Sequence, residues 1–133
     1  MSQENVEIVR QANAAYAAGG MDAALPFFTD DTVLYSIPEW TDDPEYHGHD
    51  GLRLLDQQWR DSFDDFGFEV QELYDAGDSV VSLHALTGRT KDSGIPMMMQ
   101  IGAVVTGFSG GRIGAQRLFS SWESALEAAG LEE

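Results

Sequence analysis

His84 is the side chain in this sequence best suited to move a proton at neutral pH. It lies within the apolar run VVSLHAL, residues 80–86, whose composition predicts a strand. If the even-numbered residues of that run face a pocket, the ordinary histidine pKa near 6.5 makes His84 a candidate general base. The alternative is a structural histidine, hydrogen-bonded within the wall or lying on the outer face.

Tyr35 is the second candidate catalytic side chain. Residues 32–37 predict a strand with Val33, Tyr35 and Ile37 on one face. A tyrosine hydroxyl there could donate a hydrogen bond to an oxyanion that develops during a reaction. The alternative is an aromatic wall residue whose hydroxyl group already has a partner.

Aromatic and methionine side chains could line a pocket for an apolar ligand. Methionine adapts to irregular apolar shapes, and alternate members of the run Met97-Met98-Met99 must face opposite sides of a strand. On the last predicted strand, either Gln116 or Arg117 could orient a ligand carbonyl. For the aromatic residues, plain core packing is the alternative role. The candidate substrate-binding residues are Tyr16, Val33, Ile37, Trp40, Trp59, Phe63, Met97, Met99 and Gln116.

The sequence predicts neither a metal site nor a cofactor. It contains no cysteine, which excludes thiolate ligands, disulfides and thiol nucleophiles. His47 and His49 stand two residues apart, before the start of a predicted helix. Asp42 or Asp50 would have to supply a third ligand for a metal ion.

Charge restricts the classes of partner. The chain has 133 residues and a net charge of −16 from 7 basic and 23 acidic residues. Such a field repels phosphate backbones and anionic membrane surfaces, so a neutral or cationic small molecule is the expected partner. The N-terminal sequence MSQENVEIVRQ lacks the pattern of a signal peptide, and no window has about 18 consecutive apolar residues. We therefore expect a cytoplasmic protein with one domain over residues 1–133.

Helical spacing of apolar residues predicts most of the N-terminal half. A first helix should end at Gly19-Gly20, and a short one over residues 21–28 should be shortened or kinked by Pro26. A third helix begins at residues 49–51. Its apolar stripe is Leu52, Leu55, Trp59 and Phe63, with Asp56 and Arg60 paired on its flank.

After Asp65, apolar residues recur at every second position, the spacing typical of a strand. Strands are predicted from residue 66 and over 80–89, 95–108 and 112–119, joined by short turns into an antiparallel meander. Ser120 and Glu123 form a capping-box pattern that begins a terminal helix. Helices segregated from an antiparallel sheet indicate an α+β fold.

Several segments, in the same order and over essentially the whole chain, resemble SnoaL-like proteins of the nuclear-transport-factor-2-like (NTF2-like) superfamily. They are ENVEIVRQANAAYAAGGMDAALPFFTDDTVLY, YHGHDGLRLLDQQW, DAGDSVV, SGGRI and ESALEAAGL. The resemblance implies a cone-shaped α+β fold, in which a curved antiparallel sheet wraps around N-terminal helices and encloses a pocket. Members of the superfamily include polyketide cyclases, isomerases, hydrolases, dehydratases and non-catalytic domains, so the fold alone does not give the function.

The resemblance also tests particular chemistries. The base and the two oxyanion-hole groups of ketosteroid isomerases correspond here to Tyr35, Ala103 and Ala12, so that activity is not expected. Limonene-epoxide hydrolases need an Asp-Arg-Asp arrangement, and no aspartate occurs between residues 95 and 119. No inward acidic residue of the SnoaL cyclase type is identified.

The function expected is that of a small-molecule pocket protein. We expect a cofactor-independent isomerase, cyclase, dehydratase or hydrolase acting on a small apolar carbonyl-bearing or polycyclic compound. The alternative is a non-catalytic domain that binds a hydrophobic ligand or associates as a dimer. The predicted strands carry apolar residues on both faces, which predicts a homodimer through the outer face of the sheet.

Overall fold

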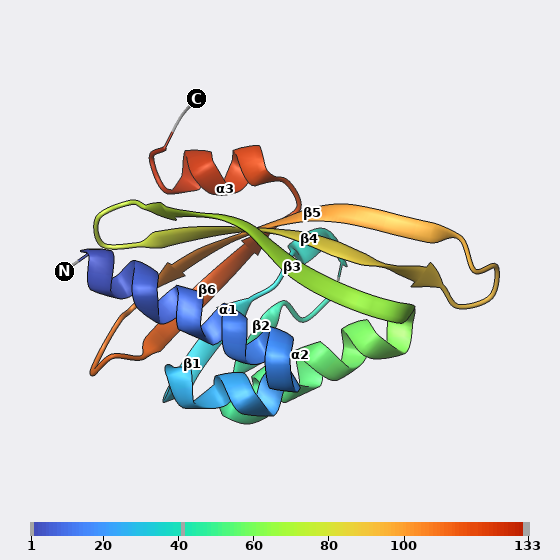
Figure 1. Ribbon diagram of the computed structural model, residues 1–133, viewed down its shortest axis with the longest axis horizontal. Helices are drawn as coiled ribbons and strands as arrows, with labels where there is room; N and C mark the ends of the chain where they lie inside the picture. The colour runs from blue at the N-terminus through green and yellow to red at the C-terminus, as the bar shows by residue number, and fades with distance from the viewer. Residues whose placement is uncertain (1, 41, 132–133) are drawn as a thin grey trace.

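The computed structural model describes residues 2–40 and 42–131 (Figure 1). Helix α1 (Ser2–Ala24) bends at Gly20, whose φ of 80° is a backbone conformation that glycine adopts readily. A short 3₁₀ helix, η1 (Leu25–Phe27), follows with Pro26 in its first turn. The two predictions for this segment, a helix stop at Gly19-Gly20 and a distorted second helix, are therefore confirmed.

Six strands form one curved sheet in the order β2-β1-β6-β5-β4-β3. Their bounds are β1 (Phe28–Tyr35), β2 (Glu45–His47), β3 (Phe63–Asp75), β4 (Val80–Thr90), β5 (Pro96–Thr106) and β6 (Ile113–Phe119). The meander from β3 to β6 is antiparallel as predicted, but β1 pairs with β6 in parallel, so the sheet is mixed. The short strand β2 lies in a segment for which the sequence predicted no strand.

Two further helices and a 3₁₀ turn complete the fold. Helix α2 (Gly48–Ser62) ends one residue before Phe63, which begins β3 instead of ending the helical stripe. The 3₁₀ helix η2 (Pro38–Trp40) connects β1 to the following loop. Helix α3 (Trp122–Ala128) is capped by Ser121, whose hydroxyl accepts from the backbone N–H of Ser124, so the predicted cap was one residue early.

Different helices cover the two faces of the sheet. Helices α1 and α2 lie against one face and α3 lies against the other (Figure 1). On β4, Val80 and Leu86 belong to the core beneath α1 and α2, whereas Val81 and Leu83 pack against α3. The even-numbered residues of β4 therefore face the N-terminal helices, and its odd-numbered residues lie on the side of α3.

Helix α3 covers much of the outer face that was expected to need a partner. A Cβ added at Gly102 on β5 would come within 2.4 Å of Ala125 Cβ, so the helix approaches the strand as closely as glycine permits. Met98 and Ile95, near the other end of the β4–β5 hairpin, remain 74% and 58% exposed. The α+β prediction is confirmed by this arrangement. No helix among the described residues is long and apolar enough to cross a membrane.

Candidate functional site

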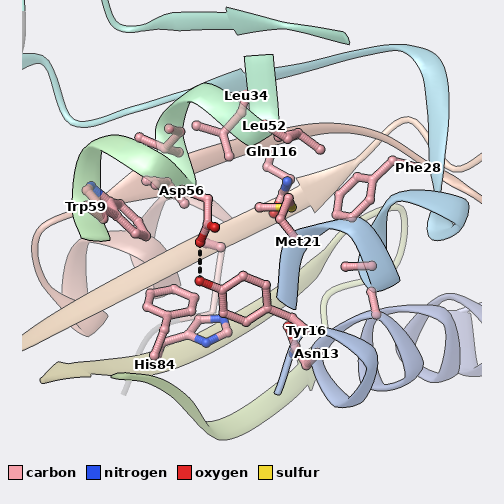
Figure 2. Close-up of a pocket in the computed structure, with 16 residues that line it drawn as sticks. Asn13, Tyr16, Met21, Phe28, Leu34, Leu52, Asp56, Trp59, His84 and Gln116 are labelled. Carbon is pink, nitrogen blue, oxygen red and sulfur yellow. Dashed lines mark hydrogen bonds between the residues drawn. The ribbon is translucent and has the colours of Figure 1, made fainter. Parts of the chain in front are cut away.

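A cavity of about 80 Å³, here called the inner pocket, lies between the N-terminal helices and the sheet (Figure 2). Its lining is mostly apolar, and its polar side chains come from α1, α2, β4 and β6. The volume suits a small organic molecule, since a single water needs only about 10–15 Å³ by the same measure. The lining residues are Ala12, Asn13, Tyr16, Met21, Ala24, Phe28, Leu34, Leu52, Leu55, Asp56, Trp59, Phe68, His84, Ala103, Gln116 and Leu118.

Asp56 on α2 is the carboxylate of the inner pocket. Its side chain is only 12% exposed, and Tyr16 on α1 donates a hydrogen bond to its Oδ1 (Figure 2). Arg60, one helical turn away, donates from Nε to Oδ2 at 2.9 Å. Burial, together with the hydrogen bond to Asp56, raises the pKa of Tyr16 well above its ordinary value of 10. Tyr16 therefore stays protonated at physiological pH and acts as a hydrogen-bond donor.

His84 on β4 is the second titratable side chain in the lining. It is 4% exposed and stacks on Phe68, with ring centroids 4.2 Å apart and planes at 14°. Its Nε2 lies 2.7 Å from Ser82 Oγ, whereas Nδ1 is buried and has no hydrogen-bond partner among the described residues. Burial lowers the pKa of His84 to about 4, so the ring is neutral at pH 7.

A second cavity of about 520 Å³, here called the outer hollow, adjoins the inner pocket. Leu55 and Trp59 line both cavities and therefore stand between them. The Trp59 ring is held in place by Phe66 and Phe68, with ring centroids 5.9 and 5.4 Å away. The lining residues of the outer hollow are Ser36, Trp40, Tyr46, Leu55, Gln58, Trp59, Ser62, Phe63, Met97 and Met99.

The predicted substrate-binding residues separate into three groups. Tyr16, Trp59 and Gln116 line the inner pocket, so Gln116 rather than Arg117 faces this cavity. Trp40, Phe63, Met97 and Met99 line the outer hollow, where Trp59 recurs. Val33 and Ile37 line neither cavity.

Tyr35 also lies outside both linings. On β1 the buried residues Thr32 and Leu34 alternate with the half-buried Val33 and Tyr35, so Leu34 faces the inner pocket in place of its neighbours. The Arg117 guanidinium stands over the Tyr35 ring, 4.5 Å from its centroid. This placement separates the two predicted catalytic residues, because only His84 reaches the pocket.

The two neighbouring histidines before α2 have separate partners. His47 Nε2 lies 3.1 Å from Glu45, and His49 Nε2 lies 3.2 Å from the backbone oxygen of Phe28. Over residues 2–40 and 42–131, no three histidine, aspartate or glutamate side chains are grouped so that they could hold a metal ion.

Asp56 is the site residue that the sequence interpretation missed. It was assigned to the flank of α2, paired with Arg60. However, Asp56 lies four residues after Leu52 and three before Trp59, so it shares the helix face that those side chains present to the core. A carboxylate at these offsets on an apolar stripe was the available signal.

Comparison with known proteins identifies the family. Residues 9–115 match the model of the SnoaL-like domain. The chain belongs to the SnoaL-like domain family. No curated protein matches this SnoaL-like chain, but many solved structures share its fold.

Three solved structures illustrate the likeness of this SnoaL-like chain to known folds. One is a candidate SnoaL-like polyketide cyclase from Mesorhizobium loti, with 23% identity, a TM-score of 0.69 and coverage of 85% of this chain and 96% of that chain. The second is a protein with a ketosteroid isomerase-like fold from Catenulispora acidiphila, in complex with trimethylamine, with 19% identity, a TM-score of 0.70 and coverage of 94% and 93%. The third is TerC co-crystallised with polyporic acid, with 14% identity, a TM-score of 0.74 and coverage of 96% and 98%. At these identities the likeness concerns the fold.

Proposed function

We propose that the inner pocket binds a small, largely apolar, carbonyl-bearing compound and catalyses a proton transfer on it without a cofactor. One observation carries the proposal: a carboxylate and a neutral imidazole, Asp56 and His84, line the same apolar cavity from two different elements (Figure 2). A base and a hydrogen-bonding group around one small ligand are the parts that abstraction of a proton next to a carbonyl requires.

In the proposed reaction Asp56 accepts a proton from the carbon next to the ligand carbonyl. A carboxylate has about four lone-pair sites, so the bonds from Tyr16 and Arg60 leave room for that proton. The electron pair of the broken C–H bond moves onto the carbonyl oxygen, which binds the free Nδ1 of His84. Return of the proton to another carbon gives isomerisation, and attack of the carbanion on a second carbonyl gives cyclisation.

This assignment changes the roles expected from sequence. His84 was expected to act as the base, but burial lowers its pKa to about 4 and makes it a weak proton acceptor at pH 7. Tyr35 was expected to stabilise the oxyanion, but it lies outside the lining of both cavities. In the proposal Asp56 takes the first role and His84 takes the second.

The outer hollow suits the remainder of a larger ligand. It shares Leu55 and Trp59 with the inner pocket, and its aromatic and methionine lining offers apolar surface for a second ring. The described lining of both cavities contains no lysine or arginine, and the chain carries a charge of −16, which favours a neutral or cationic ligand. The co-crystallisation of TerC with polyporic acid supports the capacity of this fold to hold a small organic ligand.

A second candidate function is non-catalytic binding of an apolar ligand. It is favoured by the fact that both oxygens of Asp56 already have partners, so the carboxylate could serve to anchor α1 to α2. The two functions make different predictions for the same assay, because a binding protein would leave the C–H bonds of its ligand intact.

The proposed function is tested by exchange of α-protons for deuterium in D₂O. Aryl ketones and cyclic enones, with acetophenone as the smallest member, are followed by NMR with and without the protein. The expected result is faster exchange of at least one ketone, which is lost in Ala103→Leu, because the larger side chain fills the cavity from β5. Binding of the same ketones without exchange would instead establish the non-catalytic function.

Assembly gives a further expected result. We propose that the protein forms a homodimer through the part of the outer sheet face that α3 leaves open, around the exposed Met98. Light scattering at micromolar protein and about 0.15 M salt should give twice the chain mass of 14.6 kDa. Because two chains that each carry a net charge of −16 repel each other, lower salt should weaken the dimer. Met98→Lys should abolish it. A stable mass of 14.6 kDa at every salt concentration would contradict the proposal.

A further inference from the structure

A short chain of buried hydrogen bonds leads from α1 to the imidazole of His84. Asn13 on α1 donates from Nδ2 to Ser82 Oγ at 3.2 Å, and Ser82 Oγ lies 2.7 Å from His84 Nε2. Ser82 is only 1% exposed, and Ser82 and His84 point to the same side because they are two apart on β4. These hydrogen bonds end at Nε2, and the other ring nitrogen, Nδ1, has no partner among the described residues.

The direction of each bond follows from counting donors. A neutral imidazole carries one proton, on Nδ1 or on Nε2, and a serine hydroxyl has one proton to donate and two lone pairs. If Nε2 carried the proton and donated it to Ser82, the Ser82 hydroxyl would accept twice and its own proton would be buried without a partner. The Nδ1–H tautomer leaves only the Nδ1–H donor without a partner, whereas the Nε2–H tautomer leaves both the Ser82 proton and the Nδ1 lone pair unpaired. The additional unpaired buried group favours the Nδ1–H tautomer by about fivefold or more. Ser82 therefore donates to Nε2, and the ring proton lies on Nδ1.

We propose that Ser82 is a positioning residue that holds His84 as its Nδ1–H tautomer, while Asn13 only orients the Ser82 hydroxyl, so that the inner pocket presents a neutral donor and selects ligands with an acceptor oxygen. The tautomer assignment stands on the hydrogen bonds alone, whereas the ligand class rests on the proposed function and deepens it. A carbonyl oxygen satisfies the donor, and an isosteric ligand without the oxygen leaves it unpaired.

The tautomer is measured directly by nitrogen-15 NMR of the histidine rings at pH 8, which needs no ligand. The wild-type spectrum should show the proton of His84 on Nδ1. Ser82→Ala removes the partner of Nε2 and should give a mixture of both tautomers. Asn13→Ala removes only the donor to Ser82 and should leave the wild-type tautomer in place.

Asn13→Asp is the decisive variant because it reverses the donor and acceptor roles along these hydrogen bonds while the side-chain volume stays nearly constant. The introduced carboxylate can only accept, so Ser82 donates to it and the Ser82 Oγ is left to accept from His84 Nε2. The ring proton should therefore move to Nε2. A wild-type proton on Nε2, an unchanged tautomer in Asn13→Asp or an unmixed tautomer in Ser82→Ala would each overturn the positioning role.

Ligand selection is tested with acetophenone and α-methylstyrene, in which a CH₂ group replaces the carbonyl oxygen. Wild-type protein should bind acetophenone about tenfold more tightly, and this preference should disappear in Asn13→Asp while it persists in Asn13→Ala. Equal affinity of the wild type for both probes would overturn the selection. Because neither readout requires turnover, these results stand apart from the exchange assay, which tests catalysis.

Discussion

Replacement of Asp56 by asparagine is expected to slow α-proton exchange by at least about 100-fold, the usual contribution of a positioned general base. The amide has nearly the same shape and can still accept a hydrogen bond from Tyr16, but it cannot take up a proton from carbon. Affinity for the ketone should change much less than the exchange rate, since the apolar lining is intact. Exchange and binding are measured by NMR on the same samples.

Asp61→Asn is the matched control for this substitution. Asp61 lies on the same helix, is exposed and accepts a hydrogen bond from Gln57, so its loss changes the net charge equally without touching the pocket. Its exchange rate should equal that of the wild type. Should Asp56→Asn exchange the ketone as fast as Asp61→Asn does, the carboxylate is not the base and its role is to join α1 to α2.

The second large effect is a pH dependence of stability that originates in His84. Burial lowers its pKa to about 4, compared with 6.5 for an unperturbed histidine. Between these values the unfolded chain binds a proton that the folded protein does not, so stability is complete above pH 6.5 and decreases as the pH falls. The loss attributable to His84 should reach about 3 kcal/mol at pH 4.

Urea unfolding of the wild type and of His84→Gln isolates this contribution. Glutamine does not titrate and can still form a hydrogen bond with Ser82, while the many carboxylates titrate in both proteins. The free energy of unfolding of the wild type, relative to the variant, should therefore decrease by about 3 kcal/mol from pH 7.5 to pH 4. A difference that does not vary with pH would show that His84 titrates normally in the folded protein.

Periodicity in the sequence predicted the elements better than it predicted the site. The meander and the helix ends at glycine follow from local spacing, and the resemblance to SnoaL-like proteins was confirmed over residues 9–115. The strand β2 was missed because three residues give too short a pattern, and its pairing with β1 is a tertiary contact.

Which face of a strand is buried cannot be read from a run that is apolar on both sides. On β4 both faces are covered, one by α1 and α2 and the other by α3, so every residue from Val80 to Leu86 is buried. On β1 the register placed Leu34 inward and Tyr35 outward, opposite to the prediction. The helix face of Asp56, by contrast, was available from its spacing and was obscured by the obvious ion pair with Arg60.

In the proposed function, one small ligand lies between Asp56 and His84 in the inner pocket. A crystal structure of the protein with acetophenone tests it most directly. We expect the carbonyl oxygen within hydrogen-bond distance of His84 Nδ1 and the methyl carbon facing the Asp56 carboxylate. Acetophenone bound only in the outer hollow, or in the inner pocket with its oxygen directed away from His84, would contradict the proposed function.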